Sequence, residues 1–358
     1  MCRWFAYVGH EECLLEDVLI EPKHAITFVS EVRYALTRLI RRRADRKQVL
    51  DHYLPGLIHH EPGETQSQEQ AEEAELKMRN IMYNIDGFGV AWYSDTRSQF
   101  EIGVEGPRAA MYKTVAPIVT DTTFNFICQN TASKCILAHV RAASAPPIVE
   151  TNNHPFIFGR HSFMHNGSVT FFPQIRHGLL QRMKPEIVSQ LQGNTDSEHI
   201  AGLYISYLGD TNVAHTIDEM RKALLAAIKT VLEVQQTVLT SEQLKDNGGA
   251  SSLNLCTSDG QKMLAIRFRN HPTQQPPSLY TSTTAGIALN RKYPGSSTDT
   301  DKDVKPDDRS AQTHGKHVIV ASEPTTYQQS AWTLMKKNEL LMVDENINVK
   351  TEIVNTSV

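Results

Sequence analysis

The sequence predicts an α+β fold in which helices cover layers of sheet. Short runs rich in β-branched, aromatic and aliphatic residues recur along most of the chain, and glycines or polar residues separate them. Helical patterns are fewer and longer, and they are grouped between the strands. Several strand runs are apolar on both faces, which is typical of strands buried between two other layers.

The expected strands follow one another along the chain, each as an apolar run that ends at a glycine or a polar residue. In order they are RWFAYVG (3–9), DGFGVAWY (86–93), KCILAHVRA (134–142), RHSFMHNG (160–167), SSLNLCTSDG (251–260), KMLAIRFR (262–269), HVIVASEP (317–324) and a closing pair within 333–354.

Two helices are predicted from spacing and capping signals. The longer runs over 216–239, where apolar residues recur at the three-and-four spacing of a buried stripe. The shorter starts in GNTDSE and continues through His199 to Leu208. Thr195 and Glu198 fit an S/T-x-x-E capping box, and Asp196 complements the helix dipole in the first turn. The stripe of the longer helix consists of Ile217, Met220, Leu224, Ala227, Ile228 and Val231.

The composition is that of a globular protein whose partners are small molecules or other proteins. Hydrophobic residues make up 40% of the 358 residues and charged residues 21%. A net charge of −4 offers none of the positive field that general binding to nucleic acid or to a membrane surface needs. No apolar run approaches the roughly 18 residues of a membrane span.

Cysteine usage and the N-terminus predict a cytoplasmic location. The five cysteines are odd in number and scattered, without a C-x-x-C pair, which favours a reducing compartment. The first residues lack the basic region, long apolar core and cleavage site of a signal peptide, so we expect the encoded N-terminus to be kept apart from Met1.

We expect one elaborated domain over 1–358, because no internal repeat is visible. Two stretches interrupt the strand and helix pattern. A charged insertion at about 41–80 opens with RRRADRK, and a polar loop at about 292–316 is expected to be disordered. Neither stretch carries visible chemistry.

Cys2 directly follows the initiator methionine, so removal of Met1 would leave a thiol and a free α-amine on one residue. The reference pKa values of these groups, about 8.5 and about 7.7 to 8.0, suit proton transfer in acyl chemistry near neutral pH. No separate histidine or aspartate would then be needed. The alternative is that Cys2 is an ordinary small buried residue.

Arg141 lies near the end of the apolar run LAHVRAAS. Pointing inward, its guanidinium would be a buried charge that demands an anion, such as a substrate carboxylate held by two hydrogen bonds. Pointing outward, or paired within the protein, it would need no ligand. His139 shares its strand face and could equally be a core histidine with a satisfied ring.

Glycine-containing segments supply two further candidates. Asn166 and Gly167 read first as a turn at the end of a strand, but the same pair could donate hydrogen bonds to a developing oxyanion. Gly87 and Gly89 in IDGFGV lack the third glycine of a phosphate-binding loop, and they indicate only a close approach of another segment.

Taken in order, MCRWFAYVG, NIDGFGVAWY, LAHVRAAS, NNHPF, FMHNGSV and GNTDSEH resemble the class II glutamine amidotransferase domain of the N-terminal nucleophile hydrolase superfamily. The likeness is greatest to the stand-alone fungal subunits of glutathione degradation. It extends to VIVASEP and covers most of the chain outside the two interruptions. The resemblance implies a four-layer αββα fold of two antiparallel sheets face to face.

The resemblance also implies roles for seven residues. Cys2 corresponds to the nucleophile whose own α-amine is the base, and Asn166 and Gly167 to the oxyanion hole. Substrate-binding positions are Arg141 for the α-carboxylate, Asp196 for the α-ammonium, and Ser144 and His154 in the pocket. Ser144 stands where many relatives have threonine.

The implied reaction is cleavage of a γ-glutamyl amide, of glutathione to glutamate and Cys-Gly, beside a partner subunit that resembles a zinc dipeptidase and holds the metal. We expect no cofactor and no metal in this chain. Three alternatives stay open: a glutaminase that delivers ammonia to a separate synthase, a γ-glutamyl hydrolase of another thiol pathway, and a binding subunit without turnover. Arg141 and Asp196 do not distinguish these alternatives, because every γ-glutamyl compound carries the α-carboxylate and α-ammonium that they are expected to bind.

Overall fold

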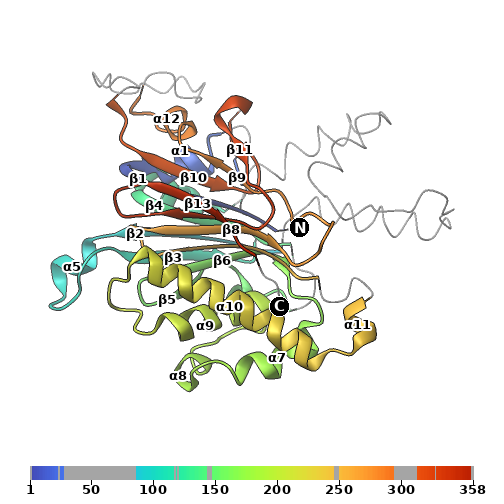
Figure 1. The fold of residues 1–358 in the computed structure, drawn as a ribbon. Helices are drawn as coiled ribbons and strands as arrows, with labels where there is room; N and C mark the ends of the chain where they lie inside the picture. The colour runs from blue at the N-terminus through green and yellow to red at the C-terminus, as the bar shows by residue number, and fades with distance from the viewer. Residues whose placement is uncertain are drawn as a thin grey trace.

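The computed structural model describes residues 2–22, 25–27, 86–116, 118, 121–142, 147–245, 250–293, 313–326 and 328–355. Two antiparallel sheets lie face to face, and helices cover the outer face of each (Figure 1). This arrangement confirms the α+β class and the four-layer αββα order. The expected insertion at 41–80 and most of the loop at 292–316 lie outside the described residues, and the single domain stays a prediction.

The first sheet is seven-stranded with the order β11-β9-β10-β1-β4-β2-β3, so the N-terminal strand β1 is central. Side chains of β1 alternate as a strand requires: Trp4 and Ala6 face the other sheet, whereas Phe5 and Tyr7 face the helices. The strands are β1 (Arg3–Leu14), β2 (Phe88–Ser94), β3 (Arg108–Thr114), β4 (Ala132–Val140), β9 (Tyr280–Ser282), β10 (His317–Ala321) and β11 (Thr333–Leu334).

The second sheet is six-stranded with the order β13-β12-β8-β7-β6-β5. Its central strand β7 is buried along its whole length, because helices lie on one side of it and the first sheet on the other. The strands are β5 (Phe156–Phe158), β6 (His161–Ser168), β7 (Ser252–Ser258), β8 (Met263–Arg269), β12 (Glu339–Val343) and β13 (Val349–Ile353).

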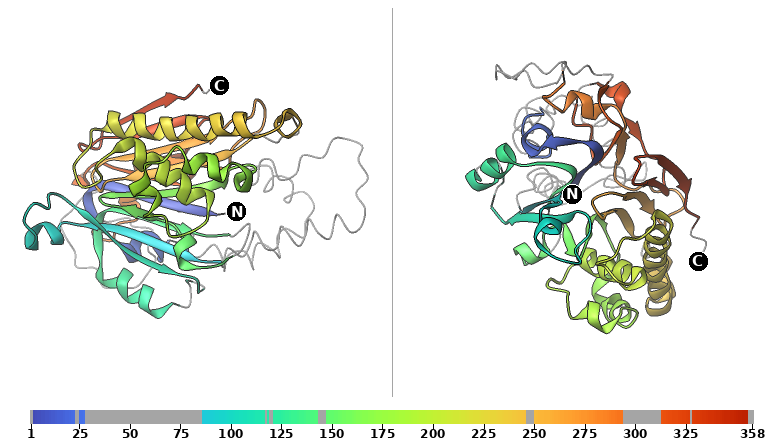
Figure 2. Two further views of the ribbon diagram at one scale, coloured as in Figure 1. Left: turned by 90° about the horizontal axis from the view of Figure 1, so that it is seen from below. Right: turned by 90° about the vertical axis from the view of Figure 1, so that its left-hand side faces the viewer.

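The helices divide between the two outer layers (Figures 1 and 2). Outside the first sheet are α1 (Leu15–Leu19), α6 (Thr122–Asn130) and α12 (Ala285–Ala288). Outside the second are α7 (Phe172–Leu180), α8 (Pro185–Val188), α9 (Asp196–Leu208) and α10 (Ile217–Val238). Two short helices are α5 (Thr96–Phe100), on a projecting connection between β2 and β3, and α11 (Ser241–Lys245). No described helix is long and apolar enough to cross a membrane.

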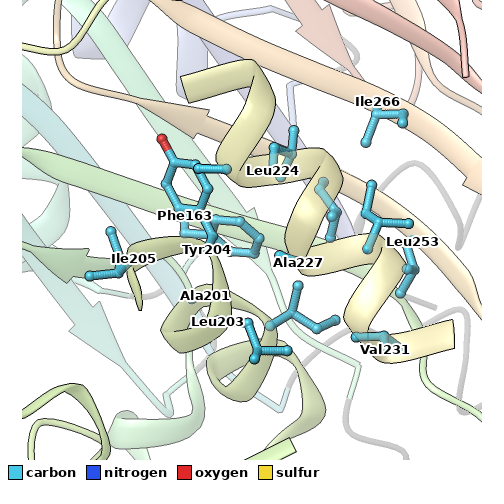
Figure 3. Packing of buried hydrophobic residues seen from close by; sticks show 14 of the residues in the cluster. Phe163, Ala201, Leu203, Tyr204, Ile205, Leu224, Ala227, Val231, Leu253 and Ile266 are labelled. Carbon is cyan, nitrogen blue, oxygen red and sulfur yellow. The ribbon is translucent and has the colours of Figure 1, made fainter. Parts of the chain in front are cut away.

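Three apolar clusters separate the four layers. One packs α7 to α10 on the second sheet, a second lies between the sheets, and a third packs α1, α6 and α12 on the first sheet. In the first cluster, Leu224 and Ala227 of α10 face Leu253 and Ile266 of the sheet (Figure 3). Burial of such side chains contributes about 25 cal/mol per Å² of apolar surface, so these contacts hold the helix layer in place.

The helix expected at 216–239 is confirmed as α10, and its start has a complete capping box between Thr216 and Glu219. The second helix is confirmed as α9, but its capping box is only half formed. Thr195 accepts the Glu198 N–H, whereas the Glu198 carboxylate accepts N–H bonds from Gln192 and Gly193 instead of from Thr195. Glu198 therefore fixes the GNTD loop before the helix.

The α10 stripe yields a stability prediction. Leu224 is fully buried, so Leu224→Ala should lower the free energy of unfolding by about 2 to 5 kcal/mol. Leu225 is the neighbouring, partly buried control, and Leu225→Ala should cost less than half as much. Urea denaturation followed by circular dichroism measures both, and equal losses would contradict the assigned face of α10.

Candidate functional site

The start of β1 and the end of β4 lie side by side. Arg3 pairs with Val140 in antiparallel register, and Val140 pairs in turn with Phe88 at the start of β2. Cys2 directly precedes Arg3, and Arg141 directly follows Val140. Strand pairing therefore brings Cys2 and Arg141, which are far apart in sequence, to one end of the first sheet.

The Cys2 side chain is half-buried and contacts the backbone that follows Arg141. Its Sγ donates to the Ala142 carbonyl at 3.5 Å and accepts the Ala142 N–H at 3.3 Å. Burial raises the pKa of the Cys2 thiol, and Asp196 also raises it, whereas the Ala142 hydrogen bond and the Arg141 charge lower it. The thiol consequently needs a base before it can react as a thiolate.

The segment ASEP (321–324), which begins at the last residue of β10, holds the N-terminal strand β1 in place. The Trp4 N–H donates to Ser322 Oγ at 3.0 Å, and the Ser322 N–H donates to the Trp4 carbonyl at 2.9 Å. Arg3 and Glu323 add an ion pair beside these bonds. Cys2 is therefore attached to a strand that is fixed on both sides.

Arg141 is buried, with 5% of its surface exposed. Its Nη1 donates to Asn153 Oδ1 at 3.5 Å, and it forms no ion pair with a carboxylate of the described residues. Burial lowers the pKa of the guanidinium, and Cys2, Asp86 and Asp196 raise it. The inward orientation is thus the observed one, and a buried cation of this kind suits an anionic ligand.

Gly87 and Gly89 allow the NNHPF segment to pass directly over β2. A Cβ on Gly89 would lie 2.0 Å from the His154 carbonyl oxygen, and a Cβ on Gly87 2.4 Å from the Asn153 side chain. Gly87 also has a φ of +139°, which favours glycine. The close approach predicted for these glycines is confirmed, and it places Asn153 against Arg141.

His139 and His154 form a buried pair next to this crossing. Their ring centroids are 4.0 Å apart, and burial lowers the pKa of both, that of His139 to about 3. His139 Nε2 contacts the His165 carbonyl at 3.1 Å and must carry the proton, because a carbonyl only accepts. His139 is therefore a core histidine that joins the sheets, and neither His154 nitrogen has a partner among the described residues.

Asn166 and Gly167 lie within β6 and do not form the expected turn. They pair with Asn254 and Leu253 of β7, so the ladder overrides the turn preference of the dipeptide. Asn166 is buried, and its Oδ1 has no hydrogen-bond partner among the described residues. A Cβ on Gly167 would lie 1.9 Å from the Ser252 carbonyl oxygen, so only glycine fits. Gly167 itself is exposed.

Asp196 begins α9 and is fixed by neighbouring backbone. Its Oδ2 accepts the Val169 N–H at 2.7 Å, and its Oδ1 accepts the Ser197 N–H at 2.8 Å. Its charge acts on both Cys2 and Arg141. A thiol, a buried cation and a carboxylate thus share one site.

Sequence reasoning missed three polar residues that support this site. Asn153 contacts Arg141, while His165 and Ser197 lie behind Asp196. The alternation of β6 could have indicated His165, because it must face the helices if Asn166 faces the other sheet. Ser144 lies outside the described residues. Within the described ranges, no three His, Cys, Asp or Glu side chains are grouped so that they could hold a metal ion.

Comparisons with known proteins agree on one family. The family described as "Glutamine amidotransferases class-II" matches residues 76–357. A Saccharomyces cerevisiae protein described as "Probable glutamine amidotransferase DUG3" is 28% identical over 358 residues, with 96% of this chain and 82% of that protein covered. A glutamine aminotransferase class-II domain protein from Silicibacter pomeroyi has a similar fold, with a TM-score of 0.54, 20% identity, and coverage of 98% of this chain and 99% of its own.

The different burial of the five cysteines predicts selective labelling. All five are free thiols, but only Cys2 is partly exposed. Iodoacetamide should therefore modify the native protein at Cys2 alone, and faster as pH rises above neutral, because burial raises the pKa of this thiol. Peptide mapping by mass spectrometry identifies the site.

The same reaction in concentrated urea is the control and should modify all five cysteines. Native labelling of Cys135 or Cys256 at the rate of Cys2 would contradict the described burial.

Proposed function

This chain belongs to the class II glutamine amidotransferases, and from that premise we propose that it hydrolyses γ-glutamyl amides with Cys2 as nucleophile. The observation that carries the proposal is the grouping of the Cys2 thiol, the Arg141 guanidinium, which has no carboxylate partner among the described residues, and the Asp196 carboxylate. A γ-glutamyl group presents a carbonyl carbon, an α-carboxylate and an α-ammonium, which match these three in chemistry.

The first half of the reaction forms a thioester. With Met1 removed, the Cys2 α-amine takes the thiol proton, and the thiolate attacks the γ-carbonyl carbon. The Asn166 Nδ2 and the Gly167 N–H donate to the resulting oxyanion, each such donor contributing about 3 to 4 kcal/mol to lowering the barrier. The intermediate collapses, the C–N bond breaks, and the leaving amine takes the proton from the α-ammonium.

Water completes the cycle. The free α-amine removes a proton from water, the hydroxide adds to the thioester carbonyl, and glutamate leaves as the Cys2 thiolate is protonated again. Arg141 holds the α-carboxylate through both halves by charge-assisted hydrogen bonds, and Asp196 holds the α-ammonium. We assign His154 and Ser144 to the substrate pocket, as the resemblance implies.

We propose glutathione as the substrate, cleaved in the cytoplasm to glutamate and Cys-Gly. This choice is supported by the ordered motifs, which resemble the fungal subunits of glutathione degradation. The proposal includes a separate partner subunit resembling a metallopeptidase, which would process the dipeptide product.

The substrate proposal predicts a clear difference between two γ-glutamyl compounds. With the partner subunit present, the protein should release glutamate from glutathione and produce little ammonia from glutamine. Coupled assays for glutamate, ammonia and Cys-Gly measure both reactions at matched concentrations. Strong ammonia production without glutathione cleavage would instead identify a glutaminase that supplies a synthase.

The nucleophile assignment predicts that Cys2→Ala lowers turnover by at least about a thousandfold, because no other group can form the thioester. Binding of glutathione, measured by calorimetry, should remain. The intact mass of the wild type should lack Met1, since a retained methionine would occupy the amine. Cys135→Ala is the matched control, because Cys135 is a buried thiol between the sheets, and it should stay active. Unchanged activity of Cys2→Ala would disprove the assignment.

A further inference from the structure

A chain of side-chain contacts lies behind Asp196, on the face of β6 that points to the helices. His165 Nδ1 is 2.9 Å from Ser197 Oγ, and Ser197 Oγ is 3.2 Å from Asp196 Oδ1. At its other end the imidazole contacts the Ser252 carbonyl through Nε2 at 3.0 Å. His165 and Ser197 are 1% and 6% exposed, so water does not compete for these bonds.

The Ser252 carbonyl fixes one proton of His165. A carbonyl oxygen only accepts, so Nε2 carries a hydrogen in either charge state of the ring. Gly167 keeps this contact tight, because a Cβ there would lie 2.9 Å from His165 Nε2 and 1.9 Å from the Ser252 oxygen. The only variable proton on the ring is therefore the one at Nδ1, which faces Ser197.

The Ser197 hydroxyl has one hydrogen and two neighbours that can accept it. When His165 is neutral, its bare Nδ1 accepts this hydrogen, and Asp196 Oδ1 keeps only the backbone N–H of Ser197. When His165 is protonated, Nδ1 donates to Ser197 Oγ, and the hydroxyl then donates to Asp196 Oδ1. Protonation of His165 thus adds a donor and a nearby positive charge to the Asp196 carboxylate.

Other charged and titratable groups near His165 come from four elements. His139 and Arg141 lie on or just after β4, His154 lies in the segment before β5, Lys113 lies on β3, and Asp196 lies on α9. Burial lowers the pKa of His139 and His154, so both are neutral near pH 7. Among these histidines, only His165 is hydrogen-bonded to the Ser197 hydroxyl, which also contacts Asp196.

We propose that His165 and Ser197 are positioning residues that set the affinity of Asp196 for an α-ammonium group, so that affinity falls when His165 is protonated. The α-ammonium ligand rests on the function proposed above. The hydrogen-bond relay from His165 through Ser197 to Asp196 does not itself require turnover. The pair thereby makes recognition of the γ-glutamyl group depend on pH through one buried hydrogen.

L-Glutamate and glutarate test the relay by binding alone. The two dicarboxylates differ only in the α-ammonium group, so the ratio of their dissociation constants reports the Asp196 site. Calorimetry on the full chain at pH 8.5 and pH 5.5 should show the preference for L-glutamate falling about tenfold at the lower pH, the size of one hydrogen bond to a charged group.

Two variants remove the relay in different ways. His165→Asn keeps a polar group near the Nδ1 position but cannot titrate, and Ser197→Ala removes the hydroxyl. Both should bind L-glutamate with a preference that changes less than about threefold between the two pH values. Thermal unfolding confirms that each variant is folded, and either variant alone suffices for the test.

Matched controls come from the same elements. His161 lies on β6 with 1% exposure, and Ser206 lies on α9 with 6% exposure, where its hydroxyl accepts the Lys184 N–H. His161→Asn and Ser206→Ala should keep the pH dependence of the wild type. A wild-type preference that does not change with pH, or an equal pH dependence in His165→Asn and Ser197→Ala, would overturn the relay.

The outcomes that would contradict the proposed function differ from those that would contradict the relay. A preference for L-glutamate that depends on pH as described, without hydrolysis of any γ-glutamyl amide, would support the relay and reject the hydrolase. Equal binding of L-glutamate and glutarate at pH 8.5 would reject the α-ammonium site and overturn the relay, whereas hydrolysis by Cys2 is decided by the glutamate assay.

Discussion

The antiparallel pairing of β1 between β4 and β10 is the constraint on which the site depends. It places Cys2 beside Arg141 and Ala142 on one side and carries Trp4 to Ser322 on the other. A shift of the β1 register by one residue would move Trp4 and Ala6 from the space between the sheets to the face that the helices cover. The burial of this central strand therefore keeps Cys2 in a single register.

Most of the fold could be predicted from apolar patterning, and the exceptions have physical causes. The strand β3 was missed because RAAMYKT is a half-buried edge strand with little aliphatic alternation. The Asn166–Gly167 turn was wrong because pairing with β7 supplies hydrogen bonds that local turn preference cannot outweigh. Helices such as α6 and α7 are short, so their stripes are too brief to identify.

The charged residues of the candidate site could be predicted from the sequence, whereas the residues that hold them in place could not. Arg141 within an apolar run signals a buried cation, and Asp196 at a helix start signals an accessible carboxylate. The choice between inward and outward orientation needed the structure, which shows the guanidinium against Asn153. Alternation along β6 could indicate the face of His165, but its contact with Ser197 joins elements that are distant in sequence, so no spacing rule could have found it. The Glu198 contacts are local, but they replace the expected capping-box bond to Thr195, which the S/T-x-x-E pattern alone cannot reveal.

The pairing of Phe5 with Ala321 has a consequence for the order in which the protein forms. Contacts between such distant positions close late, because the entropy of a long loop must be overcome first. During synthesis β1 cannot pair with β10 until β10 has been made, so the Trp4–Ser322 bonds and the Arg3–Glu323 ion pair form only after residue 323 has been added. A chain that ends before β10 would contain Cys2 but not the strand and side chains that hold β1 in place. The reactive site therefore forms only in chains that include β10.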